Sequence, residues 1–85
     1  MKIWVVIAET LGTDGEFCSE VYLETSGQKA GEFASSLIAD MCETMGVEGV
    51  DPTETWMIDA EDWFYRVRIE EREISFGILF DVKSA

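Results

Sequence analysis

One amphipathic stretch, residues 25–46, constrains the fold of this chain more than any other segment. Its apolar side chains recur at the spacing of a single helical face: Ala30, Phe33, Ala34, Leu37, Ile38, Met41 and Met45. Thr25 and Gln28 have the spacing of a capping box at the start of a helix. Gly46 stands where a left-handed residue would end the helix, and Val47 is placed to close a Schellman contact back onto Cys42. The pattern predicts one long helix whose inner face enters the core through Phe33, Leu37, Ile38 and Met41.

The other segments have the composition of strands joined by short turns. Residues 2–9 are β-branched or aromatic almost throughout, which predicts a central strand covered on both faces or carrying an apolar patch. Residues 16–24 alternate, which predicts a half-exposed strand that turns a row of carboxylates to solvent. Three more strands are expected at residues 54–59, 63–70 and 73–82. Turns are expected at residues 12–15, 59–62 and 71–72, and a loop at residues 47–53.

Taken together, the segments predict a single α+β domain over residues 1–85 in ββαβββ order. The expected sheet is antiparallel and has about five strands, with the helix packed on one face. Strand 73–82 is expected beside strand 2–9, because both are long and apolar. In strand 63–70 the odd-numbered residues are expected to point inward, as are Trp56 and Ile58 of the preceding strand.

One helix, roughly 27 Å long, cannot cover both faces of such a sheet. The uncovered face is expected to carry Trp4, Val6, Phe64 and Leu79 beside Arg66 and Arg68. An exposed aromatic group of this kind indicates a homodimer or partner interface. The alternative is that the long arginine stems lie over the aromatic rings and nothing binds there.

The sequence offers little for catalysis. It contains no histidine, the usual general acid or base, and neither cysteine has a base near it in sequence. Cys18 and Cys42 fit no zinc or redox spacing and are predicted to be half-buried thiols in a reducing cytoplasm. The turns at 14–16 and 59–62 offer carboxylates for a loosely held divalent cation but lack EF-hand spacing. We therefore expect no enzyme activity, no cofactor and no metal site. The apolar run after Lys2 is too short for a signal peptide, which predicts a cytoplasmic protein.

Charge is the unusual property of the chain. Eighteen acids against six bases give a net charge of −12. Residues 1–62 contain fourteen acids and two bases, whereas residues 63–85 contain four of each, so the whole excess precedes Trp63. Such an excess disfavours nucleic acid and anionic membranes as direct partners and favours a basic protein. The alternative is that the acids only keep the domain soluble.

In size and acidity the chain resembles small phage-encoded inhibitors such as anti-CRISPR and anti-restriction proteins, many of which are acidic α+β domains, and also nuclease immunity proteins. The resemblance implies a protein that occupies the nucleic-acid site of a basic partner by presenting fixed negative charges, as DNA does. Tyr22 is the expected aromatic anchor. The predicted partner-binding residues are Glu16, Glu20, Tyr22, Glu24, Glu32, Asp40 and Glu43.

Two other functions are compatible with the sequence. The chain can be a non-enzymatic assembly domain that dimerises through the uncovered sheet face. It can also be a small enzyme or ligand-binding domain whose site forms only in an oligomer.

Overall fold

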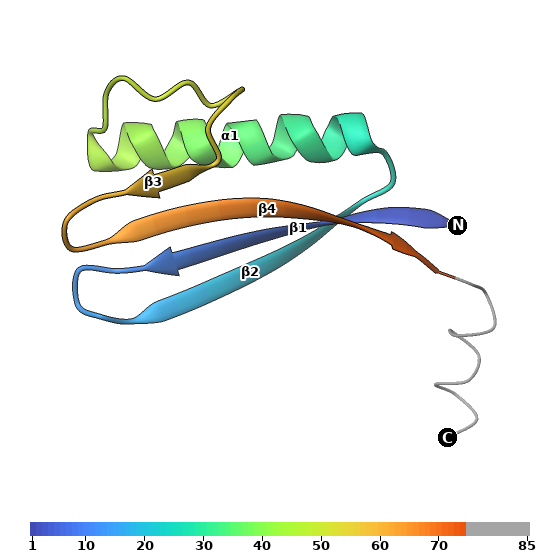
Figure 1. The fold of residues 1–85 in the computed structure, drawn as a ribbon, viewed down its shortest axis with the longest axis horizontal. Coiled ribbons are helices and arrows are strands. Elements are labelled where there is room, and N and C mark those ends of the chain that lie inside the picture. Colours follow the sequence, from blue (N-terminus) through green and yellow to red (C-terminus); the bar gives the residue numbers. More distant parts are fainter. Residues whose placement is uncertain (75–85) are drawn as a thin grey trace.

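The computed structural model describes residues 1–74, which form four strands and one helix (Figure 1). Strands β1 (Lys2–Leu11) and β2 (Phe17–Glu24) form a hairpin that leads into helix α1 (Gly27–Met45). The short strand β3 (Met57–Asp59) and the long strand β4 (Phe64–Glu73) complete the set. The predicted α+β class with a helix on one face is confirmed. Within the described residues, however, the order is ββαββ, with four strands in place of about five.

All four strands lie in one antiparallel sheet in the order β2-β1-β4-β3. Strand β1 is central, as predicted, but its second neighbour is β4 and not the segment after it. The loop between α1 and β3 runs back along the helix, so that β3 has the same direction as β1 (Figure 1). That return places β3 outside β4, at the edge of the sheet.

Helix α1 begins one residue later than predicted. Ser26 is the N-cap, and its hydroxyl accepts a hydrogen bond of 3.0 Å from the Lys29 amide. The predicted end is confirmed: Gly46 has φ 69°, and the Val47 amide donates to the Cys42 carbonyl at 2.9 Å. This is the Schellman geometry, which glycine adopts without the steric penalty that a Cβ would bring.

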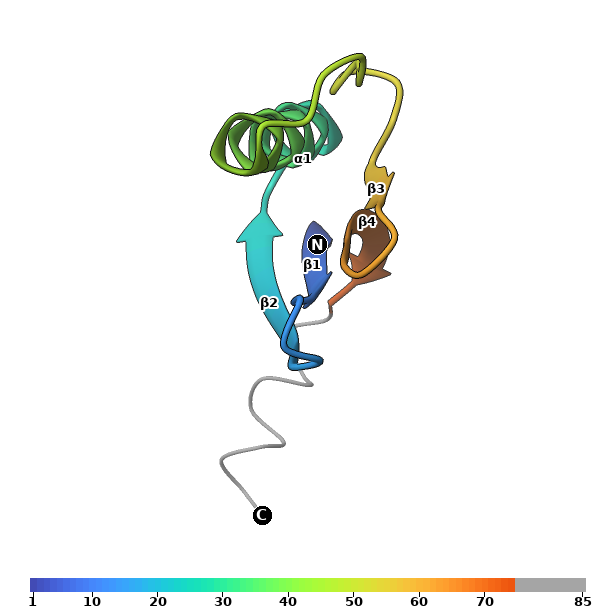
Figure 2. The ribbon, with the colours of Figure 1, turned by 90° about the vertical axis from the view of Figure 1, so that its left-hand side faces the viewer.

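The core lies between α1 and one face of the sheet, as the end-on view in Figure 2 shows. The fully buried helix residues are Ala30, Ala34 and Ile38, spaced four apart, and they pack on the middle of the sheet: Val6, Ala8, Ile58, Tyr65 and Val67. The predicted inner face is confirmed, since Phe33, Leu37 and Met41 are half-buried against this core. The small alanine side chains let the helix approach the sheet closely. The large apolar side chains that the helix adds to the core therefore come from its flanks.

The side-chain directions in β1 differ from those predicted. Trp4 and Val6 point toward the helix, and Val6 is fully buried, whereas both were expected on the uncovered face. Alternation along the strand places Ile3, Val5 and Ile7 on that face instead. A continuous apolar run has no period of two, so its sequence does not indicate which residues face the core.

The two faces of strand β2 are also exchanged relative to the prediction. Val6 lies opposite Tyr22 in the ladder, so Tyr22 shares the helix side with Glu20 and Glu24. The apolar residues Phe17, Val21 and Leu23 point to the other face and are 56%, 59% and 66% exposed. The helix packs mainly on β4 and β1 and reaches β2 only at its flank, so the β2 carboxylates remain accessible beside it.

Strand β4 continues through residues 71–72, where a turn was predicted. Its partner strand supports it there, because Lys2 and Ile3 pair with Glu73 and Arg72. The predicted inward residues of this strand are confirmed by the burial of Tyr65 and Val67, and Ile58 of β3 is also buried. The predicted strand 73–82 falls outside the described residues, apart from Glu73 and Ile74; the Ile74 amide donates to the Met1 carbonyl at 2.7 Å. Leu79 also lies outside them.

Candidate functional site

Carboxylates without a basic partner gather on the helix side of the molecule. We define the acidic surface as five predicted partner-binding residues on β2 and α1: Glu20, Glu24, Glu32, Asp40 and Glu43. None of them forms an ion pair with another residue of the described part of the chain, and all but the half-buried Glu24 are exposed. The strand and the helix are joined by a two-residue connection, which fixes both sets of charges on one scaffold.

The best-defined part of this surface is the junction of β2 with the flank of α1. The Tyr22 ring packs edge-on against Phe33, with centroids 4.7 Å apart and an interplanar angle of 75°. The Tyr22 hydroxyl donates a hydrogen bond to the Glu20 carboxylate. Asp40 is two turns along from Phe33 and therefore lies on the same flank of the helix. Tyr22 is thus half-buried against Phe33 and bonded to Glu20, whereas the sequence predicted an exposed anchor.

Both tyrosines of the junction have perturbed pKa values. The hydrogen bond to Glu20 raises the pKa of Tyr22, and partial burial and the Glu20 charge act in the same direction. Burial raises the pKa of Tyr65, with smaller contributions from Tyr22, Glu20 and Asp40. Carboxylates of both the strand and the helix thus contribute to the raised pKa of Tyr65.

The other predicted residues are more dispersed. Glu16 lies in the β1–β2 turn, where its amide donates to Asp14 at 3.0 Å, and it is not part of the junction. Glu24 is half-buried opposite Trp4 at the far end of β2. Glu32 and Glu43 are eleven residues apart on the outer side of α1, and Glu32 accepts a hydrogen bond from Gln28. The structure therefore places Glu20 and Asp40 on the strand and the helix flank that meet at the Tyr22–Phe33 contact, and it spreads the remaining acids more widely.

The basic residues, by contrast, are largely neutralised within the sheet. Glu9 accepts hydrogen bonds from Arg66 at 2.9 Å and Arg68 at 3.2 Å, and Glu70 accepts from Arg68 and Arg72. We call these five residues, which lie side by side on the face opposite the helix, the charge ladder. Lys2 pairs with Glu71 at 3.0 Å. The Met1 amino group pairs with Glu73 at 3.1 Å. Among residues 1–74, Lys29 is the one basic side chain without an ion pair, and thirteen of the seventeen described acids have no basic partner there.

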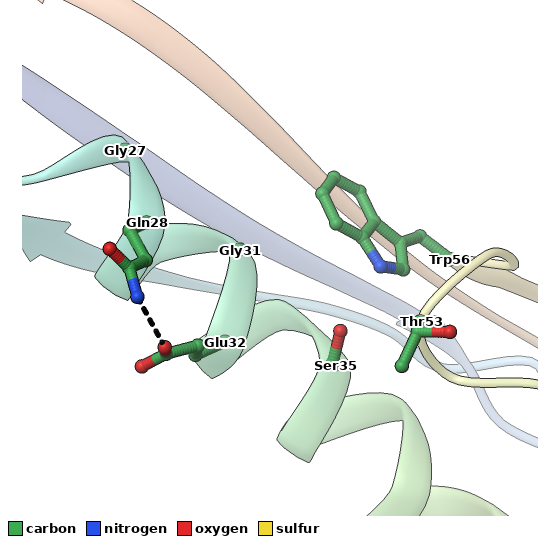
Figure 3. Close-up of a pocket in the computed structure, with 7 residues that line it drawn as sticks. All are labelled: Gly27, Gln28, Gly31, Glu32, Ser35, Thr53 and Trp56. Carbon is green, nitrogen blue, oxygen red and sulfur yellow. Dashed lines mark hydrogen bonds between the residues drawn. The ribbon is translucent and has the colours of Figure 1, made fainter.

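The described part of the chain has a hollow at each end of helix α1. The first, about 430 Å³, lies between the start of α1 and the loop before β3 and is shallow (Figure 3). Its walls are small or neutral side chains, with Glu32 as the one carboxylate: Gly27, Gln28, Gly31, Glu32, Ser35, Thr53 and Trp56. The second, about 340 Å³, lies between the β1–β2 turn and the end of α1 and is mainly apolar. Each lining contains hydroxyl side chains and one carboxylate, but among the described residues no hydrogen bond joins a lining hydroxyl to that carboxylate.

The remaining candidates for chemistry are not assembled into sites. In residues 1–74, no three His, Cys, Asp or Glu side chains are placed to hold a metal ion. Cys42 is half-buried as predicted, but Cys18 is exposed on the helix side of β2, and both thiols are free. Hydrogen bonds from Thr53 lower the pKa of Asp51, so this carboxylate is engaged in shaping its own turn. No helix in the described part of the chain is long and apolar enough to cross a membrane.

The sequence predicted an uncovered apolar sheet face, but the β2 residues on that face were not among those assigned to it. Four of the six exposed large apolar side chains among the described residues lie there: Phe17, Val21, Leu23 and Met57. The alternation in β2 did separate Phe17, Val21 and Leu23 from the acids, but that pattern is typical of an inward-facing apolar side. The signal in the sequence for the orientation of β2 was Tyr22, because it is the one large aromatic residue on the same strand face as the β2 acids.

No protein-family model, curated protein or solved structure matches the chain.

Proposed function

We propose that this domain is a non-enzymatic inhibitor that binds a basic, nucleic-acid-binding protein through the acidic surface and blocks its nucleic-acid site. The observation that carries the proposal is the segregation of charge. Nearly all described bases are used in ion pairs on β1 and β4, whereas the carboxylates of β2 and α1 have no internal partner. A surface of this kind repels nucleic acid and attracts the lysines and arginines that normally hold phosphates.

Rigidity supports the proposal. Glu20 and Asp40 stand on a strand and a helix that are held together by the Tyr22–Phe33 contact, and the Glu20 carboxylate is also held by the Tyr22 hydroxyl. Fixed charges steer association and raise the on-rate, and little conformational entropy is lost when they pair. A cytoplasmic location, where the exposed thiol of Cys18 stays reduced, is part of the same proposal.

Charge reversal at Glu20 and Glu24 tests the proposal. The full chain is immobilised at low salt, incubated with lysate of a candidate host, and the captured proteins are identified and assayed for nucleic-acid binding. We expect a basic nucleic-acid-binding protein that is released by salt and by duplex DNA. The double variant E20K/E24K should bind it at least tenfold more weakly, because two close charge pairs become repulsive.

A matched control separates this surface from total charge. The variant E61K/D62K changes the net charge equally, but its positions are exposed in the β3–β4 connection. The proposal expects this variant to retain most of the affinity, with circular dichroism showing both variants folded. Equal loss in the two variants would mean that only overall charge matters. The domain is also added to activity assays of a Cas effector, a restriction enzyme and a nuclease. Failure to reduce the activity of any of them would refute inhibition.

A further inference from the structure

The sheet face opposite the helix is covered by no other described element (Figure 2). We call it the bare face. On β1 and β2 it presents a nearly continuous apolar area, formed by Ile3, Val5, Ile7, Leu11, Phe17, Val21 and Leu23. Cross-strand partners extend this area, since Val5 lies opposite Leu23 and Ile7 opposite Val21. Apolar patches of this extent on a small domain mark interaction surfaces.

The bare face is also the surface of this acidic chain where charge is balanced. Its β4 side carries the charge ladder, in which three arginines meet Glu9 and Glu70. Glu9 is only 13% exposed, because the Arg66 and Arg68 guanidinium groups cover it. Along the described strands, the one carboxylate on this face outside the ladder is Asp59 of β3, opposite Phe64. Two copies of the chain can therefore approach here without the repulsion that their other surfaces impose.

We propose that the bare face binds the bare face of a second copy, forming a two-fold dimer in which two sheets stack and both helices lie outside. Sheets stacked in this way are about 10 Å apart, with interdigitating apolar side chains between them. The β1–β2 halves supply the apolar centre. The two charge ladders lie toward the rim, where arginine and glutamate side chains tolerate solvent.

The available area requires that the whole face takes part. Strands of ten, eight, three and ten residues, at about 3.3 Å per residue and about 4.8 Å apart, give a projected face of roughly 500 Å². Stable specific interfaces bury about 800 Å² of accessible surface on each partner. A contact along one edge would fall far short of this area, whereas full stacking comes nearer to it, because protruding side chains add accessible surface to the projected area. This comparison favours face-to-face packing over edge pairing through β2.

The dimer adds a property to the proposed function, although it does not depend on it. With both helices outside, the two acidic surfaces point in opposite directions from the stacked sheets. A dimer would thus present two binding surfaces to basic partners, and binding to a repeated or dimeric partner would gain from avidity. Self-association is measured without any partner, so its failure is distinguishable from failure of the inhibitor proposal.

Sedimentation equilibrium of the full chain and of the variant Val21→Asp tests the dimer. Val21 is 59% exposed in the single chain, so an aspartate there should leave the fold intact while placing a charge in the apolar centre of the interface. We expect a dimer for the full chain and at least a tenfold higher dissociation constant for Val21→Asp. The control Ala39→Asp adds the same charge at an exposed position of α1 and should remain dimeric.

The salt dependence of the dimer provides a second readout, which is opposite in direction to that expected for binding of a basic partner. Added salt screens the repulsion between two acidic chains and leaves apolar contacts in place, so the dimer should persist or strengthen as salt rises. A full chain that is monomeric at every concentration overturns the proposal; the occupant of the bare face would then be another protein or residues 75–85 of the same chain. Equal weakening by Val21→Asp and Ala39→Asp would also overturn it, because the interface would not be the bare face.

Discussion

At the scale of single residues, Tyr22 shows what alternation in a sequence does and does not reveal. The period of two correctly separates Tyr22, Glu20 and Glu24 from Val21 and Leu23. It does not show which set faces the helix, because register fixes that choice and one step reverses it. The structure places the Tyr22 ring against Phe33, so the β2 acids that share its face of the strand also lie on the α1 side.

Titration of the two tyrosines checks this local environment. Both pKa values are raised, Tyr22 chiefly by its hydrogen bond to Glu20 and Tyr65 chiefly by burial. Ultraviolet absorbance should therefore show phenolate formation above the ordinary pKa of about 10. The chain contains only these two tyrosines, so the signal is complete. In Glu20→Gln the Tyr22 pKa should fall toward that ordinary value, whereas the pKa of Tyr65 should stay raised.

The same shifts predict how stability depends on alkaline pH. Because the folded chain holds these protons more tightly than the unfolded chain, their contribution is fully present below a pH of about 10 and is lost as pH rises through the folded pKa values. Chemical denaturation at pH values below and above this range measures the contribution of the two tyrosines to the free energy of unfolding. Tyrosines that titrate as free residues in the folded protein would contradict the packing of Tyr22 and Tyr65.

At the scale of elements, the sequence predicts the helix well and the strands unevenly. The i, i+4 spacing of Ala30, Ala34 and Ile38 and the glycine at position 46 are local signals, and both are confirmed. The strand errors come from non-local pairing. Residues 71–72 have the composition of a turn, yet they are held in β4 by β1 and by the Lys2–Glu71 ion pair. Nothing local in the sequence shows such a partner.

Within α1, the buried face should determine stability and the outer face should not. Ile38 is fully buried against Val6 and Val67, so Ile38→Ala should lower the free energy of unfolding by about 2–5 kcal/mol. Met45, near the end of the same helix, is 44% exposed, and Met45→Ala should cost less than about 1 kcal/mol. Urea denaturation followed by circular dichroism measures both. Similar losses for the two variants would contradict the assignment of the core.

At the scale of the whole molecule, the sheet separates two surfaces of different chemistry. The helix side carries carboxylates that have no internal partner, and the opposite side carries apolar residues with a balanced charge ladder. The acidic excess follows from the composition, and its position before Trp63 follows from the order of the residues. It does not predict that most of the described bases are already paired with acids of β1 and β4, which requires the register of the two strands. That pairing increases the contrast between the two surfaces.

Competition between the domain and duplex DNA for a captured basic partner tests most directly whether the acidic surface occupies the nucleic-acid site of that partner. Fluorescence anisotropy of labelled duplex bound to that partner is followed as the full chain is added at several salt concentrations. The acidic surface should displace the duplex competitively, with an apparent affinity that falls as salt rises, and E20K/E24K should displace it poorly. A ternary complex in which domain and duplex remain bound together, or displacement that salt does not weaken, would contradict the proposed function.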